Sequence, residues 1–417
     1  MSSESTMSTP AGLALDTQGT LAGASDVPAP RRQHWAAVLA VAFSAAVFCT
    51  TEFMPVGLLR YIAQGLSVSE GAAGWMVSAP GLLAALAAPL VTVLAGRLDR
   101  RIVLWALGVL LVLANLTAAL APSFAVLVLG RVLFGVGLGG FWAIGAGIGS
   151  RLVEPAAAPK ATSVIFAGVS VGMLVGGAAG AWIGEHWGWR AAFGLTTALS
   201  VAALLATLAC LPPLRVTQRV KVASLWRIVA TPAGRLGLLV MMIALIGQFA
   251  AYTYITPFLA HEVKLAGTLI PLVLFGYTLV GAAGNFVAGA FAGRAARATL
   301  MVAIAMIALP LGGLQAGVAH LVPVLLLLAV WGLGYGAMPV ALQVWIDKVS
   351  EGAGEAGMAL FVMNFQLSIA LGAWAGGWLV DSAGIAHTLR VASGLVLAAL
   401  LLLWRLAGRS DVPTPQV

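Results

Sequence analysis

The feature that most limits the fold of this chain is a series of apolar stretches, each about 20 residues long, that recurs almost from end to end. A helix of that length crosses the hydrocarbon core of a bilayer, and it bonds all its backbone polar groups internally. Hydrophobic residues make up 61% of the chain and charged residues only 9%, which excludes a soluble protein of this size. The sequence therefore predicts an all-α membrane protein.

Twelve spans are expected, joined by loops too short to hold a soluble domain. The longest connection, 212–234, is a predicted cytoplasmic linker between a six-helix bundle over 35–211 and a second one over 235–407. Residues 1–34 are expected to be a disordered cytoplasmic tail, and 408–417 a second tail. The expected spans are 35–60, 71–95, 102–121, 124–150, 160–184, 191–211, 235–259, 269–292, 299–319, 322–346, 355–380 and 386–407.

Basic residues in the loops indicate the orientation. If the N-terminus is cytoplasmic, seventeen loop Lys and Arg residues fall on the inner side and four on the outer side. This positive-inside bias predicts that both termini are cytoplasmic, in an inner membrane. The net charge of +8 is therefore a sign of topology, with membrane lipid and not nucleic acid as the partner of these charges.

The chain also repeats itself at a spacing of 196 or 197 residues. Matching pairs are Gly96 and Gly293, Phe134–Gly139 and Trp331–Gly336, Gly176 and Gly372, Gly180 and Gly376, Trp182 and Trp378, and Glu185 and Asp381. We therefore expect two pseudo-repeats of like topology, with a transport pathway between them near the midplane.

Glu52 and Arg131 lie deep inside the first and fourth spans, each about 12 Å below the outer surface. Their counterparts in the second half, Gln248 and Leu328, are uncharged. A buried charge is costly unless it is paired, neutralised or hydrated, so the two residues suggest a pair that serves proton coupling. A static ion pair between two helices, or a glutamate that only lines a hydrated crevice, would also fit.

Neutral polar and aromatic residues within the spans are candidates for substrate binding, because amides and aromatic planes suit a flat, uncharged ligand such as a nucleobase. Each one alone would also fit helix packing. The candidates are Phe141, Trp142, Gln248, Tyr252, Tyr254, Asn285, Gln343, Asn364 and Gln366.

Two features suggest gating. In the fifth span, Gly168, Gly172, Gly176 and Gly180 recur every four residues and form a ridge along which another helix can approach closely. In the loop after the second span, Asp99 and Arg100 could form a latch. A packing seam and a simple positive-inside anchor are the alternatives.

Enzymatic chemistry has no support in the sequence. No HExxH or Walker motif and no Cys/His cluster is present, so we expect no enzyme, no cofactor and no metal site. Cys49 and Cys210 fall in or beside apolar spans and are interpreted as small core residues.

Several motifs resemble the major facilitator superfamily, and within it the twelve-span drug:proton antiporters. Gly130-Arg131 with Gly135-Val-Gly is similar to that family's arginine motif, which is linked to proton transfer. The 168–180 glycines are similar to its antiporter motif, although Val175-Gly176 stands where Gly-Pro is usual. The 96–101 loop is similar to a shortened form of its cytoplasmic signature.

Four segments further resemble bacterial exporters of purine ribonucleosides: Glu52–Val56, Gly139–Ala143, Pro159–Phe166 and Gly247–Ile255. The resemblance implies a monomer that exports such nucleosides and purine base analogues by alternating access, driven by inward proton flow. Sugar exporters share a start similar to Thr51–Pro55, so efflux of sugars or drugs stays open. An uptake symporter or facilitator and a sensor or scaffold that moves nothing are further alternatives.

Overall fold

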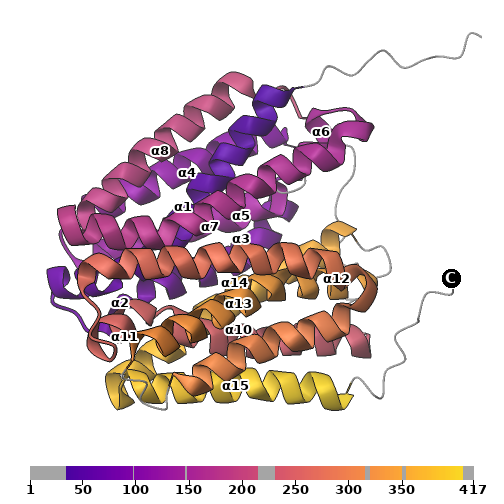
Figure 1. Ribbon diagram of the computed structural model, residues 1–417. Helices are drawn as coiled ribbons and strands as arrows, with labels where there is room; N and C mark the ends of the chain where they lie inside the picture. The colour runs from indigo at the N-terminus through magenta and orange to yellow at the C-terminus, as the bar shows by residue number, and fades with distance from the viewer. Residues whose placement is uncertain are drawn as a thin grey trace, which may run out of the picture.

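The computed structural model in Figure 1 describes residues 34–96, 98–145, 148–214, 231–314, 320–349 and 354–406. The predicted tails, most of the predicted linker and Arg97 lie outside these residues. The described elements are α1 (Trp35–Leu66), α2 (Glu70–Ala73), α3 (Trp75–Leu94), α4 (Arg100–Ala119), α5 (Phe124–Ile144), α6 (Gly149–Leu152), η1 (Pro155–Ala157), α7 (Ala158–Trp187), α8 (Trp189–Cys210), α10 (Pro232–Tyr252), α11 (Ile255–His261), η2 (Gly267–Leu269), α12 (Ile270–Gly313), α13 (Leu321–Val349), α14 (Gly354–Ala383) and α15 (Ile385–Leu406).

These helices form two groups. In Figure 1, α1 and α3–α8 lie together in the upper part and α10–α15 in the lower part, and α7 meets α12 along the division. The described chain begins and ends toward the right of this view, whereas α2 and α11 lie at the left. We call the latter the α2 end.

Within the described residues, 11 helical segments are long and apolar enough to cross a membrane. The segment that contains α12 has 47 residues, about 70 Å at the helical rise and more than twice the thickness of a hydrocarbon core. Ala295 has non-helical backbone angles (φ −139°, ψ 55°) and divides α12 into two arms, each of which can cross once. The all-α membrane fold with twelve spans is thereby confirmed.

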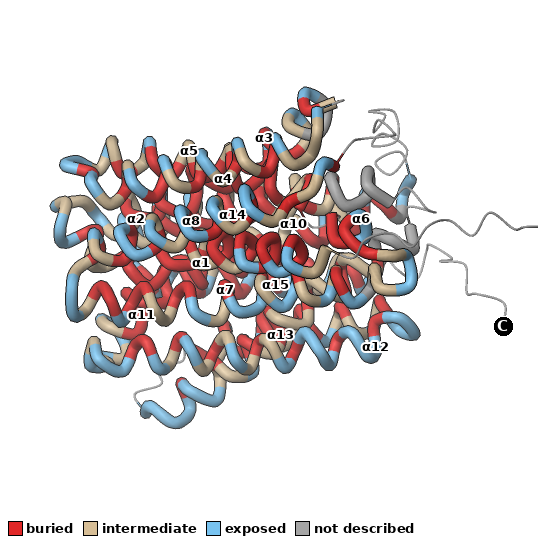
Figure 2. The backbone as a smooth tube through the Cα atoms, turned by 90° about the horizontal axis from the view of Figure 1, so that it is seen from above, coloured by how far each residue is buried: buried red, intermediate tan, exposed pale blue. Residues whose placement is uncertain are grey.

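The exterior is apolar, as a lipid-facing surface requires. Large hydrophobic side chains are exposed on both groups, among them Leu94, Leu120 and Phe286, of which the last is 81% exposed. Figure 2 shows buried residues gathered toward the middle of the molecule and exposed ones on its outside. Such a surface would aggregate in water, so it indicates contact with lipid.

The sequence repeat reappears in the way helices pack. A Cβ built on Gly180 would lie 2.5 Å from the carbonyl oxygen of Met54, and one built on Gly376 would lie 2.6 Å from that of Ala250. Both members of the second pair lie 196 residues after those of the first. The two helices that pack at this contact therefore approach each other equally closely in both groups, because glycine places no side chain between them.

Candidate functional site

Glu52 lies on α1 where the two groups of helices meet, and its carboxyl group bonds across that boundary. The side-chain amide of Gln366 on α14 donates a hydrogen bond to Glu52 Oε1 at 2.9 Å. The Trp142 indole on α5 is a second donor toward the same carboxyl group. Because Gln366 is only 3% exposed, the hydrogen bond between the groups is shielded from water.

Arg131 on α5 is held by two carbonyl groups that prolines have released. A proline has no N–H, so the carbonyl four residues before it loses its helical partner. Pro55 releases the Thr51 carbonyl in α1, and Pro80 releases the Met76 carbonyl in α3. Arg131 Nη1 donates to Thr51 at 3.0 Å, and Nε donates to Met76 at 2.8 Å. The guanidinium therefore ties α5 to both neighbouring helices beside Glu52.

The direct ion pair suggested by the sequence is not formed in this conformation. The Arg131 guanidinium is 1% exposed and lies 4.5 Å from the centroid of the Phe134 ring. In the part of the chain that the structure describes, no ion pair joins it to Glu52, although the two charges interact through space. Nη2 has no hydrogen-bond partner among these residues, so one donor stays uncommitted.

Gln248 on α10, the counterpart of Glu52, lies among aromatic rings. Trp331 Nε1 donates to Gln248 Oε1 at 2.7 Å, and Gln248 Nε2 donates to the Tyr277 hydroxyl at 3.3 Å. Tyr252 stacks on Tyr277 with ring centroids 5.2 Å apart, and on Tyr335 with centroids 6.0 Å apart. A neutral amide between stacked rings suits a flat, uncharged ligand.

Tyr335 on α13 connects this aromatic cluster with Glu52. Its ring is perpendicular to that of Phe249, with centroids 5.9 Å apart, and its phenol interacts electrostatically with Glu52 and Cys49. The Tyr335 side chain is 5% exposed, and its hydroxyl has no hydrogen-bond partner among the described residues. The aromatic cluster and the carboxyl group therefore border the same region between the two groups.

Hydrogen bonds between the two groups are concentrated at the α2 end. Asp381 on α14 accepts from Ser69 Oγ at 2.6 Å and from the Gly71 N–H at 3.0 Å, at the start of α2. Glu70 pairs with His261 at 3.7 Å. The contacts of Asp381 and Glu70 thus hold this end closed.

Tyr254 belongs to this closed end and not to the aromatic cluster. Its hydroxyl donates to the Ala373 carbonyl at 2.8 Å and lies 3.4 Å from the Gly71 carbonyl. Thr256 bridges the groups nearby by donating to the Val56 carbonyl at 2.7 Å. The polar atom of Tyr254 is therefore used to join helices, and the assignment of this residue to substrate binding stays a prediction.

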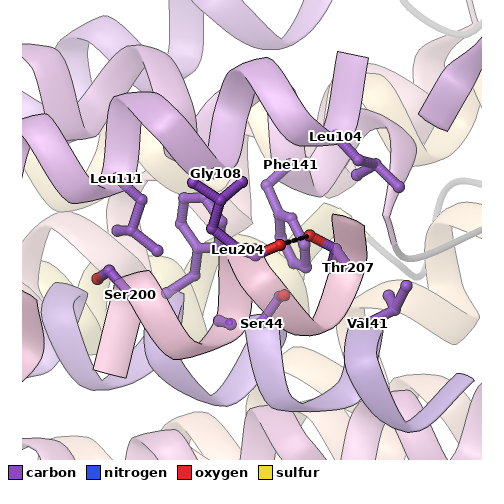
Figure 3. A pocket seen from close by; sticks show the side chains of 11 residues that line it. Val41, Ser44, Leu104, Gly108, Leu111, Phe141, Ser200, Leu204 and Thr207 are labelled. Atoms are coloured by element: carbon purple, nitrogen blue, oxygen red, sulfur yellow. Dashed lines mark hydrogen bonds between the residues drawn. The ribbon is translucent and has the colours of Figure 1, made fainter. Parts of the chain in front are cut away.

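Phe141 faces away from the boundary between the groups. It stacks on Phe48 with centroids 4.4 Å apart and lines a small cavity among α1, α4, α5 and α8 (Figure 3). The volume of this cavity, about 10 Å³, is close to that of one water-sized sphere, far below the needs of a nucleoside. Phe141 therefore packs the first group, whereas its neighbour Trp142 reaches Glu52.

The remaining substrate candidates lie on α12, α13 and α14. Asn364 donates to the Leu238 carbonyl at 2.8 Å and so joins α14 to α10 within one group. Gln343 is half-buried on α13, and Asn285 is exposed on α12 next to exposed Phe286. Gln366, in contrast, reaches the boundary between the two groups of helices. The depth of a residue within its span therefore does not predict which side chains reach that boundary.

The gating candidates make contacts within the first group. Asp99 accepts from the Arg101 N–H at 2.9 Å and from the Leu214 N–H at 2.8 Å, and the Arg100 N–H donates to the Leu214 carbonyl at 3.1 Å. The glycines pack against α1, facing backbone or side-chain atoms of its successive turns; they are Gly168, Gly172, Gly176 and Gly180. The packing seam is observed, and a role in gating stays a prediction.

Sequence reasoning missed Tyr277, Trp331 and Tyr335. A signal was present, since four of the five tyrosines lie in the second half and Trp331 is the repeat partner of Phe134, the ring beside Arg131. It also missed the contacts that close the α2 end. No group of three or more His, Cys, Asp or Glu side chains that could hold a metal ion occurs within the described ranges.

Comparison with known proteins agrees with this architecture. The Major Facilitator Superfamily profile matches residues 41–364 and, in an overlapping match, 237–416. The purine ribonucleoside efflux pump NepI of Escherichia coli O6:K15:H31 is 32% identical over 376 residues, which cover 89% of this chain and 94% of the pump. NepI of Shigella flexneri matches with the same identity and coverage.

Solved structures share the fold at low identity. A bacterial homologue of the human lysosomal transporter Spinster, solved in an inward-facing and occupied conformation, has a TM-score of 0.75 and 14% identity, with 93% of this chain and 100% of that one covered. The nucleoside transporter NupG has a TM-score of 0.72 and 14% identity, with 89% and 99% covered.

Proposed function

The chain belongs to the major facilitator superfamily, and we propose that within it the protein exports purine ribonucleosides and purine base analogues in exchange for protons. The observation that carries this proposal is the hydrogen bond between Glu52 and Gln366. It places a group that can take up a proton on the contact between two groups of helices that must separate during alternating access.

Proton uptake at Glu52 would act on both of its neighbours. Loss of the negative charge removes the attraction for Arg131 and weakens the charge-assisted hydrogen bond from Gln366. The weaker bond from Gln366 loosens the boundary between α1 and α14, and the lost attraction frees Arg131 within the first group. In the opposite sense, an ionised Glu52 can accept a hydrogen bond from the uncommitted Arg131 Nη2 when Gln366 moves away.

The proposed cycle begins with ionised Glu52 and the α2 end closed by Asp381 and the Glu70–His261 pair. Substrate enters from the cytoplasm, the halves rock, and a proton from outside displaces the substrate. Deprotonation on the inside resets the carrier. The positive-inside count supports this orientation, with the α2 end outside, both termini cytoplasmic and the protein in an inner membrane.

The aromatic cluster supports a purine as the cargo. Tyr252, Tyr277 and Tyr335 offer ring faces on which a base can stack, and Gln248 supplies an amide among them. The second half is uncharged at the positions of Glu52 and Arg131, so it can bind a neutral ligand without competing for the proton. The relatives named as purine ribonucleoside efflux pumps support the same cargo class.

Flux into proteoliposomes tests the proposal. Purified protein is reconstituted with radiolabelled inosine or guanosine on one side and a pH gradient of either sign. We expect substrate to move against its gradient only opposite to the proton flow. Movement with the protons would show symport, and flux indifferent to the gradient would show facilitation.

A pair of variants tests the role of Glu52. Glu52→Gln is expected to retain exchange of labelled for unlabelled nucleoside but to lose accumulation driven by pH. Glu262→Gln, at an exposed carboxylate, is the matched control and should behave as the wild type. A Glu52→Gln protein that still accumulates substrate with unchanged pH dependence would contradict the proposed coupling.

A further inference from the structure

The Gln366 side chain is engaged at one end only. One end of its amide bonds to Glu52, and the other end has no hydrogen-bond partner among the described residues, although the residue is 3% exposed. Buried polar atoms are nearly always bonded, so an orphan atom at this position indicates a partner that binds there. The Tyr335 hydroxyl, also orphaned and coupled electrostatically to Glu52, lies on the same boundary.

An amide has opposite hydrogen-bonding character at its two ends: the NH₂ group donates and the carbonyl oxygen accepts. An ionised carboxylate only accepts, so it must face the NH₂ group, and the carbonyl of Gln366 is left for the other partner. A protonated carboxyl group can donate its O–H to the Gln366 carbonyl, which turns the NH₂ group outward. The Trp142 indole N–H, as a donor, then faces the remaining carboxyl oxygen.

Other titratable groups do not reverse this sequence of events. The groups that face Glu52 are Arg131 from α5, Tyr335 from α13 and Cys49 from α1. At and below neutral pH a guanidinium stays protonated, and a phenol and a thiol stay neutral, so none of the three changes charge when the carboxylate takes up a proton. The proton on Glu52 is therefore the event to which the Gln366 amide responds.

We propose that Gln366 reports the protonation state of Glu52 to the substrate, by presenting a carbonyl acceptor when Glu52 is ionised and an NH₂ donor when it is protonated. This inference rests on the proposed function. Gln366 then determines substrate specificity, because it binds a given edge of the substrate in one protonation state of Glu52 and rejects that edge in the other. Substrate specificity is thereby linked to proton coupling.

The substrate classes that this device separates are 6-oxopurine and 6-aminopurine nucleosides. The former carry an acceptor at position 6 and a donor at N1; the latter carry a donor at position 6 and an acceptor at N1. Their polarity is opposite at both positions. Whichever position meets Gln366, protonation of Glu52 strengthens binding of one class and weakens that of the other. The class favoured at high pH is the one exported in exchange for protons.

Titration calorimetry of the detergent-purified full chain with inosine and adenosine, from about pH 5 to about pH 9, tests the inference. The two Kd values are expected to move in opposite directions, each by about fivefold, the change expected of one hydrogen bond. In Gln366→Met the ratio of the two Kd values should no longer depend on pH. Ser368→Ala, at a hydroxyl that bonds within its own helix, is the control and should keep the dependence.

The outcomes separate the inference from the proposed function. If both Kd values of the wild type move in the same direction, or not at all, Gln366 does not report the proton, whereas export of nucleosides can still hold. If neither nucleoside binds, the proposed function fails and the inference with it. The wild-type measurement decides this even if Gln366→Met does not fold.

Discussion

Replacement of Arg131 by lysine is expected to destabilise the first group of helices although the positive charge is retained. The planar guanidinium donates to the Thr51 carbonyl on α1 and to the Met76 carbonyl on α3 at the same time. A lysine ammonium is a compact point charge and lacks the planar, forked set of donors that a guanidinium has. It can bond one of the two carbonyls, and the other is left buried without a partner.

The size of the effect follows from that lost contact. An unsatisfied buried carbonyl costs about 1–3 kcal/mol, so we expect Arg131→Lys to lower the free energy of unfolding by about 2 kcal/mol. For a chain of 417 residues this corresponds to an apparent melting temperature lower by about 2 °C. Because unfolding of such a protein is irreversible, the temperatures must be compared at one scan rate.

Pro80 provides the decisive second variant. In Pro80→Ala the new N–H can bond the Met76 carbonyl within α3, so that carbonyl no longer needs the arginine. Arg131→Lys in this background is expected to cost about 1 kcal/mol less than in the wild type, a coupling of the size found for contacting residues. Pro89→Ala, at another proline of α3, is the matched control and should leave the cost unchanged. Equal losses in all three backgrounds would refute the idea that proline-released carbonyls hold Arg131.

Three further predictions concern the closed end, the seam and the aromatic cluster. Asp381→Asn weakens the charge-assisted hydrogen bonds to α2. In a variant without the natural cysteines, we therefore expect a cysteine introduced at Thr253 to be labelled about tenfold faster. An unchanged labelling rate would mean that Asp381 does not hold this end shut. Gly180→Val should abolish the monodisperse peak in size-exclusion chromatography, because the new side chain would clash with the Met54 carbonyl. Gly194→Ala, at a glycine with open space around it, should retain the peak and stabilise the protein by about 1 kcal/mol. Trp331→Phe orphans the Gln248 carbonyl and should cost about 1–3 kcal/mol in thermal unfolding, of which part returns when Gln248→Leu is added; no recovery would argue against their hydrogen bond.

The fold was predictable because the bilayer fixes the length of each span and forces every span to be helical. The boundaries between spans eight and nine show the limit. The sequence predicts two helices with a short loop, and the structure joins them into α12, with non-helical angles only at Ala295. A tight reversal of this kind needs so few residues that helical bonding continues almost through it.

The depth of the site residues in the membrane was predictable from the sequence, but the direction in which their side chains point was not. Glu52 and Arg131 were placed at one level by counting along their spans, and the structure brings them side by side. The rotation of a helix about its axis decides which neighbour a side chain meets, and an evenly apolar helix carries little information about that rotation. Gln366 reaches the boundary while Asn285 is exposed, although both are amides at comparable positions within spans.

In the second half, the arginine and its two prolines are all replaced. The positions equivalent to Pro55, Pro80 and Arg131 are occupied by Ala251, Tyr277 and Leu328. The packing supports this alignment, since a Cβ on Gly135 would lie 2.5 Å from the Pro80 carbonyl and one on Gly332 would lie 2.5 Å from that of Tyr277.

Where the arginine is absent, both prolines are absent too, so neither of these two positions releases a backbone carbonyl in the second half. In their place, the Tyr277 hydroxyl bonds to Gln248, the uncharged counterpart of Glu52. The buried polar groups at equivalent positions of the two halves thus find hydrogen-bond partners in different ways. In the first, backbone carbonyls hold a charge beside an acid, and in the second, side chains hold an amide among rings. The partners of a buried arginine could accordingly have been found in the sequence, by counting back four residues from each proline that lies at its depth.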